Sequence, residues 1–213
     1  GWNSLLLIFF AKSSTQLLMA LGIIGEGGSR MVVPVTVLLA CALVFLVLLR
    51  GSSGVDRIAK ILVAHVFVGA WMLYIIVTNR WADLEAAVPA YASTSPLWNY
   101  TTGVEIGIVS LLSWWPYIGA MIRMAPNGRT AAVPIMVGMG APVPLLSLIG
   151  IAGILVLKVS DPAEWLRTVG GPTYGIIALL FVAAANLGTA VAGVYAAAIG
   201  LRHFPVFERS SWP

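Results

Sequence analysis

Six long apolar runs constrain the fold of this chain more than any other feature. They cover about residues 2–24, 31–50, 58–77, 104–125, 131–157 and 174–201. A helix needs about 20 residues to cross the hydrocarbon layer of a bilayer, and each run is near or above that length. In lipid, backbone polar groups must be satisfied within the protein, and a helix does this within its own segment. The runs predict an all-α integral membrane protein, with six spans in one transmembrane domain over residues 1–213.

The charged residues support this class and exclude others. They make up 9% of the chain, against about 25% in soluble domains. The net charge of +4 does not indicate nucleic-acid binding, because the lysines and arginines stand mostly at the ends of the runs. We therefore expect the lipid bilayer as a partner and no nucleic acid.

Basic residues alternate between connections, which predicts a topology. The connections near 50–60 and 123–130 and the C-terminal tail are basic, whereas those near 25–30, 78–103 and 158–173 are less basic or charge-balanced. Because cytoplasmic loops carry the excess of Lys and Arg, the first set is expected in the cytoplasm. This predicts a multi-pass protein of the plasma (cytoplasmic) membrane, whose first span begins on the cytoplasmic side.

The fourth run is expected to contain a broken helix. It reads Ser-Trp-Trp-Pro-Tyr-Ile-Gly over residues 113–119. Pro116 lacks a backbone donor and clashes with the preceding turn, so the helix should kink or unwind there. Two explanations remain open: a Pro-kinked packing helix, or the discontinuous helix that lines the substrate site of a transporter.

Two further segments should depart from a plain span. The run at 131–157 contains three prolines and several glycines, which predicts an irregular helix. In the connection at 158–173, Asp161 can cap a short helix that has Pro162 at its first position. Such a helix on the outer face often acts as a lid in transporters.

Polar side chains inside the bilayer are the first candidates for function. Lys12 stands halfway along the first run and must face a cavity, a carboxylate or backbone carbonyls. It could substitute for a transported cation, or its ammonium could snorkel to the interface. In the last run, Asn186 is a candidate for hydrogen bonds to the edge of a ligand. The Thr189 hydroxyl, with an exposed carbonyl such as that of Ala185, could bind Na⁺, although such threonines usually bond to their own backbone.

Enzymatic chemistry is not expected. No pair of intramembrane carboxylates, Ser/His/Asp set or metal cluster can be assembled from the sequence, and no cofactor is implied. His65 and His203 lack the spacing of metal ligands. We expect His65 to make a polar contact between helices.

The motif in the fourth run resembles the nucleobase:cation symporter-1 family, especially its purine/cytosine permease branch. That branch has a Trp-x-Pro-Tyr element followed six residues later by arginine, matched here by Trp114, Pro116, Tyr117 and Arg123. Weaker matches are the Gly1-Trp2 pair and Tyr195 followed by Leu201.

The resemblance implies part of a five-plus-five inverted-repeat (leucine-transporter-like) fold with discontinuous helices. The chain would be a fragment covering about the third to eighth of twelve helices, which agrees with its start without methionine and its end soon after the sixth run.

By the same resemblance, Trp2 would stack on a planar substrate, and Trp114 and Tyr117 would line the same site. Sodium would bind near Ala185, Gly188 and Thr189. Three positions depart from the family pattern, since Leu6, Ala120 and Gly193 stand where relatives have polar groups.

The leading hypothesis is a symporter that moves a small planar heterocycle, such as cytosine, a purine, allantoin or a hydantoin. Alternating access would be coupled to H⁺ or Na⁺. The alternatives are an amino-acid permease-like transporter of the same fold and a non-transporting membrane protein.

Overall fold

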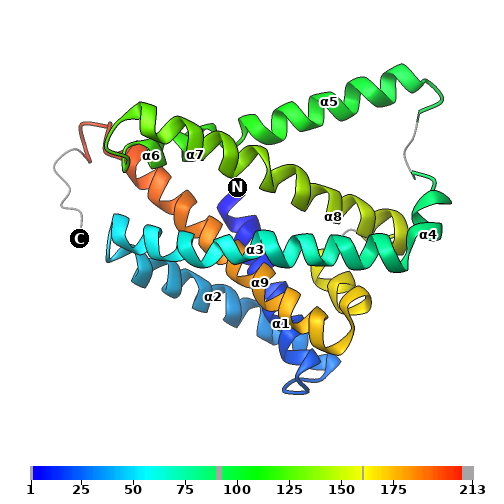
Figure 1. Cartoon of the computed structure of the whole chain (residues 1–213). Helices are drawn as coiled ribbons and strands as arrows, with labels where there is room; N and C mark the ends of the chain where they lie inside the picture. Colours follow the sequence, from blue (N-terminus) through cyan, green and yellow to red (C-terminus); the bar gives the residue numbers. More distant parts are fainter. Residues whose placement is uncertain (1, 90–92, 160, 208–213) are drawn as a thin grey trace.

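The computed structural model describes residues 2–89, 93–159 and 161–207, and this part of the chain is a bundle of helices without a strand (Figure 1). The helices are α1 (Trp2–Ala20), η1 (Glu26–Gly28), α2 (Ser29–Leu48), α3 (Ser52–Asn79), α4 (Trp81–Glu85), α5 (Pro96–Leu112), α6 (Trp115–Ile122), α7 (Gly128–Gly140), α8 (Pro142–Leu157) and α9 (Pro162–Leu201).

Five helical stretches among the described residues are long and apolar enough to cross a membrane. They are Arg30–Leu48, Ser52–Asn79, Pro96–Ile122, Gly128–Leu157 and Ala163–Leu201. The last five predicted spans are therefore confirmed as long apolar helical stretches, with ends that differ by up to 11 residues, the largest difference being at the start of the last one. The molecule is an all-helical bundle of the kind found in membranes.

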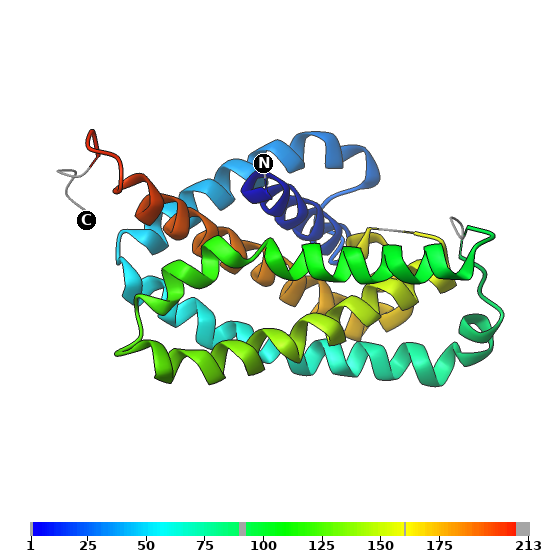
Figure 2. The same cartoon turned by 90° about the horizontal axis from the view of Figure 1, so that it is seen from above.

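The first predicted span, 2–24, is confirmed only as a helix. It ends at Ala20, and α1 is not one of the five stretches apolar enough to span. The polar residues from Lys12 to Gln16 at its centre lower its hydropathy, and they are accommodated because α1 packs most extensively on α9 and also on α2. In Figures 1 and 2, α1 lies against α9 in both views.

The predicted irregularities are present. A break at residues 113–114 separates α5 from α6, where the Trp114 N–H donates to the Leu111 carbonyl at 3.2 Å, one residue short of the α-helical pattern. Pro116 removes the donor that the Leu112 carbonyl would accept from in a continuous helix. A second break at Ala141 divides the run at 131–157 into α7 and α8.

The predicted short helix that begins at Pro162 forms, and it continues through a bend into the last span. Asp161 accepts a hydrogen bond from the Ala163 N–H at 3.0 Å, as an N-cap should. Gly171 then takes φ 64° and ψ −166°, a backbone conformation that only glycine adopts readily, and Pro172 follows. We call residues 162–170 the first part of α9 and residues 172–201 the second part.

Two apolar clusters hold the bundle together. One joins α3, α8 and both parts of α9, with Met72, Ile149, Trp165 and Leu179 among its buried members. The other joins α1, α2, α6 and the second part of α9. Small buried residues such as Ala11 and Ala190, both with no exposed surface, let α1 and α9 approach closely.

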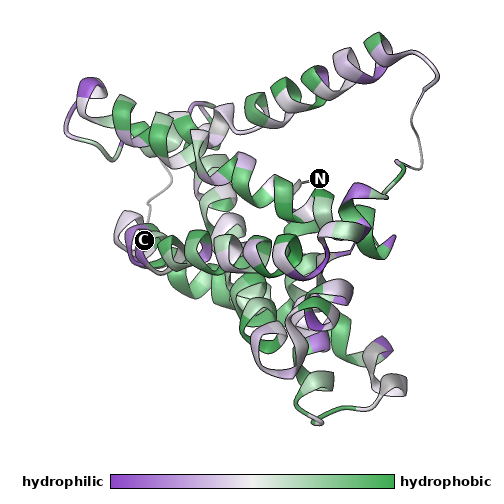
Figure 3. Ribbon diagram, turned by 45° about the vertical axis from the view of Figure 1, so that its right-hand side comes forward, coloured by the Kyte–Doolittle hydropathy of each residue, from purple (hydrophilic) through white to green (hydrophobic). Residues whose placement is uncertain are grey.

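The outward surface is apolar along the helices and more polar at their ends and turns (Figure 3). Large side chains such as Leu38, Phe45 and Phe67 are more than half exposed. In water such a surface would be unfavourable, whereas lipid tails match it. The basic connections also gather at one end, since Arg202 shares one surface hollow with Arg50 and another with Arg123.

Candidate functional site

The aromatic motif lies where α5 ends and α6 begins. Trp114 is the N-cap of α6, and Tyr117 follows one turn later on the same face. Their ring centroids are 5.3 Å apart with an interplanar angle of 52°, so the two predicted substrate residues form one aromatic surface. Trp115, between them in sequence, is 74% exposed and belongs to the outer face of the helix.

Tyr117 connects α6 with α1 and α9. Its hydroxyl donates to the Asn3 side-chain oxygen at 3.3 Å. A Cβ built at Gly193 would lie 2.8 Å from the Tyr117 ring and closer still to the Asn3 side chain, so both groups occupy the space that glycine leaves open. Three helices that are distant in sequence therefore meet at Asn3, Tyr117 and Gly193, which we call the tyrosine junction.

Asn3 is the polar residue that the sequence analysis missed. It stands beside Trp2, which was predicted as a stacking residue and whose side chain lies outside the described part of the structure. The signal was available in the sequence, because a polar residue at the start of an apolar run needs a partner in the bundle. In the family that the motif resembles, a polar side chain is expected at position 193. In this chain that position is Gly193 of α9, and the Asn3 carboxamide of α1 occupies the space beside it.

The other two departures have a packing explanation. Leu6 and Ala120 are both buried, at 7% and 6% exposure, in the apolar cluster that contains Tyr195. A carboxylate at position 120 would be surrounded by apolar side chains and would need a cationic partner there. The apolar residues at these positions are consistent with the packing of α1, α6 and α9.

The predicted ion-binding residues lie on the second part of α9. Gly188 is buried, and Thr189 is partly buried. Helical backbone between Ala185 and Thr189 directs the Ala185 carbonyl along the helix towards the Thr189 N–H. That carbonyl is therefore engaged as a helix acceptor, and no group of three or more acidic, His or Cys side chains suited to a metal ion occurs among the described residues.

Asn186, the predicted hydrogen-bonding residue, satisfies its amide within its own helix. Its side-chain nitrogen donates to the Val182 carbonyl at 2.9 Å. The structure therefore brings Trp114 and Tyr117 together, whereas the Asn186 amide is directed to the backbone of α9.

Lys12 faces a carboxylate, one of the three environments that the sequence predicted for it. Its Nζ lies 2.7 Å from one oxygen of Asp161, while the other oxygen caps α9 at Ala163. The Lys12 side chain is 46% exposed and that of Asp161 14% exposed. This ion pair ties the middle of α1 to the beginning of α9, which no motif in the sequence indicated.

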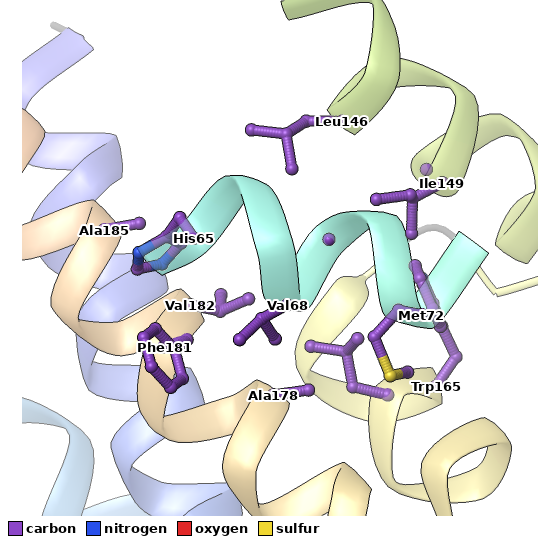
Figure 4. A pocket seen from close by; sticks show the side chains of 13 residues that line it. His65, Val68, Met72, Leu146, Ile149, Trp165, Ala178, Phe181, Val182 and Ala185 are labelled. Carbon is purple, nitrogen blue, oxygen red and sulfur yellow. The ribbon is translucent and has the colours of Figure 1, made fainter. Parts of the chain in front are cut away.

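His65 does not make the predicted polar contact. Its ring packs edge-on against Phe181 of α9, with centroids 5.3 Å apart, and neither nitrogen has a hydrogen-bond partner. The ring lines a cavity with Ala185, the first of the predicted ion-binding residues (Figure 4). The prediction was wrong because the helices that pack on α3 place apolar side chains around the imidazole.

Comparisons of the chain with protein-family models, with curated proteins and with solved structures found no match. The length and apolar composition of the helices show the membrane character of the bundle. Membership of the symporter family stays a prediction from the sequence.

Proposed function

We propose that this chain is the transmembrane domain of a secondary transporter for a small planar heterocycle, such as cytosine, a purine, allantoin or a hydantoin. The tyrosine junction carries the proposal, together with Trp114 beside it. There an aromatic surface at a helix break meets a polar group from another helix, within a bundle of long apolar helices.

This arrangement has the chemistry that such a ligand requires. The faces of Trp114 and Tyr117 can stack on a planar ring, and the Asn3 carboxamide and Tyr117 hydroxyl can bind the polar edge. A helix break is tolerated in a membrane protein where it lines a protein cavity, and transporter sites commonly use one. These features support binding of a neutral heterocycle at the junction of α1, α6 and α9.

Transport would proceed by alternating access within a five-plus-five inverted-repeat fold of the plasma membrane, with coupling to H⁺ or Na⁺. In the sodium-coupled form, Ala185, Gly188 and Thr189 are the proposed ion-binding positions. The Ala185 carbonyl has a second lone pair beside the one used in the helical hydrogen bond to Thr189, and this lone pair would face the cation.

The decisive experiment measures uptake of labelled cytosine, adenine, allantoin and hydantoin by cells that express the protein. Trp114→Ala should lower uptake of the accepted substrate by about tenfold, the effect of losing about 1.4 kcal/mol of stacking energy. Trp115→Ala is the matched control, because its exposed ring is one residue away and should leave uptake unchanged.

Two results would contradict the proposal. Absence of uptake for every compound in a correctly inserted protein would remove the substrate class. Equal uptake by the Trp114→Ala and Trp115→Ala variants would show that the aromatic surface does not bind substrate. For the coupling ion, uptake that persists without sodium and follows pH would assign H⁺ and exclude a sodium role for Thr189.

A further inference from the structure

A cavity lies away from the tyrosine junction, between α3, α8 and both parts of α9 (Figure 4). Its volume is about 220 Å³. Its walls are apolar except for two residues, His65 of α3 and Trp165 of the first part of α9. An engineered apolar cavity of about 150 Å³ binds benzene, so this space is large enough for a ring system of one or two rings.

Both polar side chains of the wall have nitrogens without partners. The Trp165 indole N–H and both nitrogens of His65 are buried and make no hydrogen bond. Trp165 is 2% exposed, and the backbone of Phe181 lies near the His65 ring without hydrogen-bond geometry. Buried polar groups are nearly always satisfied, so a ligand in the cavity that pairs with a nitrogen of His65 would supply a hydrogen bond that the protein itself does not.

The two side chains differ in freedom. The Trp165 ring is held against Gly153, where an added Cβ would lie 2.6 Å from it, so the indole is a fixed wall. His65 contacts Phe181 through one edge and is only partly buried, so rotation of its ring can turn a nitrogen towards the cavity. A neutral imidazole offers one donor and one acceptor.

From this geometry we propose that the cavity is a binding site for a small uncharged aromatic molecule, with one or two rings and a hydrogen-bonding group that pairs with His65. The apolar walls take the ring body, and Trp165 supplies an aromatic surface. This site is separate from the tyrosine junction, since none of the lining residues belongs to α1 or α6, although Ala185, a proposed ion-binding position, is part of its wall.

Gly150 offers a way to close the cavity. It lines the wall, and a Cβ built on it meets no atom within 4 Å. Gly150→Leu should therefore place its side chain in the cavity without displacing backbone. Gly138→Leu is the matched control, because Gly138 is also helical and has free space around its Cβ, but it is exposed and lies outside the cavity.

The test uses the chain purified in detergent, with benzimidazole as the probe and indene as a bicyclic control of similar size without nitrogen. Equilibrium dialysis and the thermal unfolding midpoint report binding. Benzimidazole should bind saturably and more tightly than indene. His65→Phe should weaken the affinity for benzimidazole by about tenfold, the effect of one lost hydrogen bond, and leave the affinity for indene unchanged.

Gly150→Leu should abolish the binding of both compounds. Gly138→Leu should bind both as the unmodified chain does.

A structural role for His65 gives a different result. If the imidazole is only an unsatisfied core residue, His65→Phe raises the unfolding midpoint and leaves benzimidazole affinity as it was, which overturns the proposal. Binding that persists in Gly150→Leu, or no saturable binding to the unmodified chain, also overturns it. If the leucine variant does not fold, Gly150→Met, whose flexible side chain has a similar volume, takes its place with the same readouts. None of these results depends on transport, so the proposed function is tested separately.

Discussion

At the scale of single residues, Gly193 is a position of the tyrosine junction where one added atom should matter. The Asn3 side chain and the Tyr117 ring occupy the space that a Cβ would fill. Gly193→Ala should therefore destabilise the bundle, because close-packed side chains must move. Asn3→Ala removes the nearer of these two groups and leaves the Tyr117 ring, so in that background the same change should cost less. A double-mutant cycle on detergent unfolding measures this coupling. Additive effects would show that the two residues do not share the site.

Single residues were also the least predictable part of the site. Trp114 and Tyr117 were expected at one site from the family resemblance, and their rings do lie together, since residues three apart at the start of α6 are neighbours. The partners of Asn3 and Lys12 lie 114 and 149 residues away along the chain. Helical periodicity relates residues within one helix and does not tell which distant segments come together. The sequence therefore indicated that Lys12 needs a partner, but it did not indicate that the partner is Asp161.

At the scale of elements, α9 depends on a glycine at its bend. The backbone of Gly171 has φ 64° and ψ −166°, and nothing lies within 4 Å of an added Cβ, so the constraint there is conformational. Gly171→Ala should lower the free energy of unfolding by about 1–3 kcal/mol. Gly200→Ala, in the helical end of the same element with equally free space, should instead raise stability by about 0.5–1 kcal/mol. Chemical unfolding in detergent measures the change in free energy of unfolding for both variants. If the two changes have the same sign, the backbone conformation of Gly171 is not what makes the bend require glycine.

The start of α9 combines two roles in one carboxylate. Asp161→Asn keeps an N-cap and removes the negative charge that pairs with Lys12, whereas Asp161→Ala removes both. The alanine variant should therefore be less stable than the asparagine variant by about 1 kcal/mol. In addition, Lys12→Met should have little further effect once Asp161→Asn is present. Full additivity of these two changes would show that the ion pair contributes nothing to the packing of α1 on α9.

At the scale of the whole molecule, hydropathy and proline positions were sufficient for the fold class. The long apolar helices and the breaks near residues 113 and 141 follow from local chemistry. The place of α1 does not: its run was predicted as a sixth span, but its central polar residues keep the helix out of the set apolar enough to cross a membrane. Its position depends on the small residues that let it pack on α9, and these are visible only once both helices are placed.

The arrangement of charges makes a prediction about the orientation of the whole bundle. Arg50, Arg123 and Arg202 come from three different connections and line adjoining hollows at one end, which should face the cytoplasm. Single cysteines are placed at Arg129, in the first turn of α7, and at Ser95, the N-cap of α5, in a Cys41→Ala background; the two positions lie at opposite ends of the long helices. In intact cells, a membrane-impermeant thiol reagent should label the cysteine at position 95. It should label the one at 129 only after the membrane is opened. The reverse pattern would invert the topology, and with it the side from which the tyrosine junction is reached.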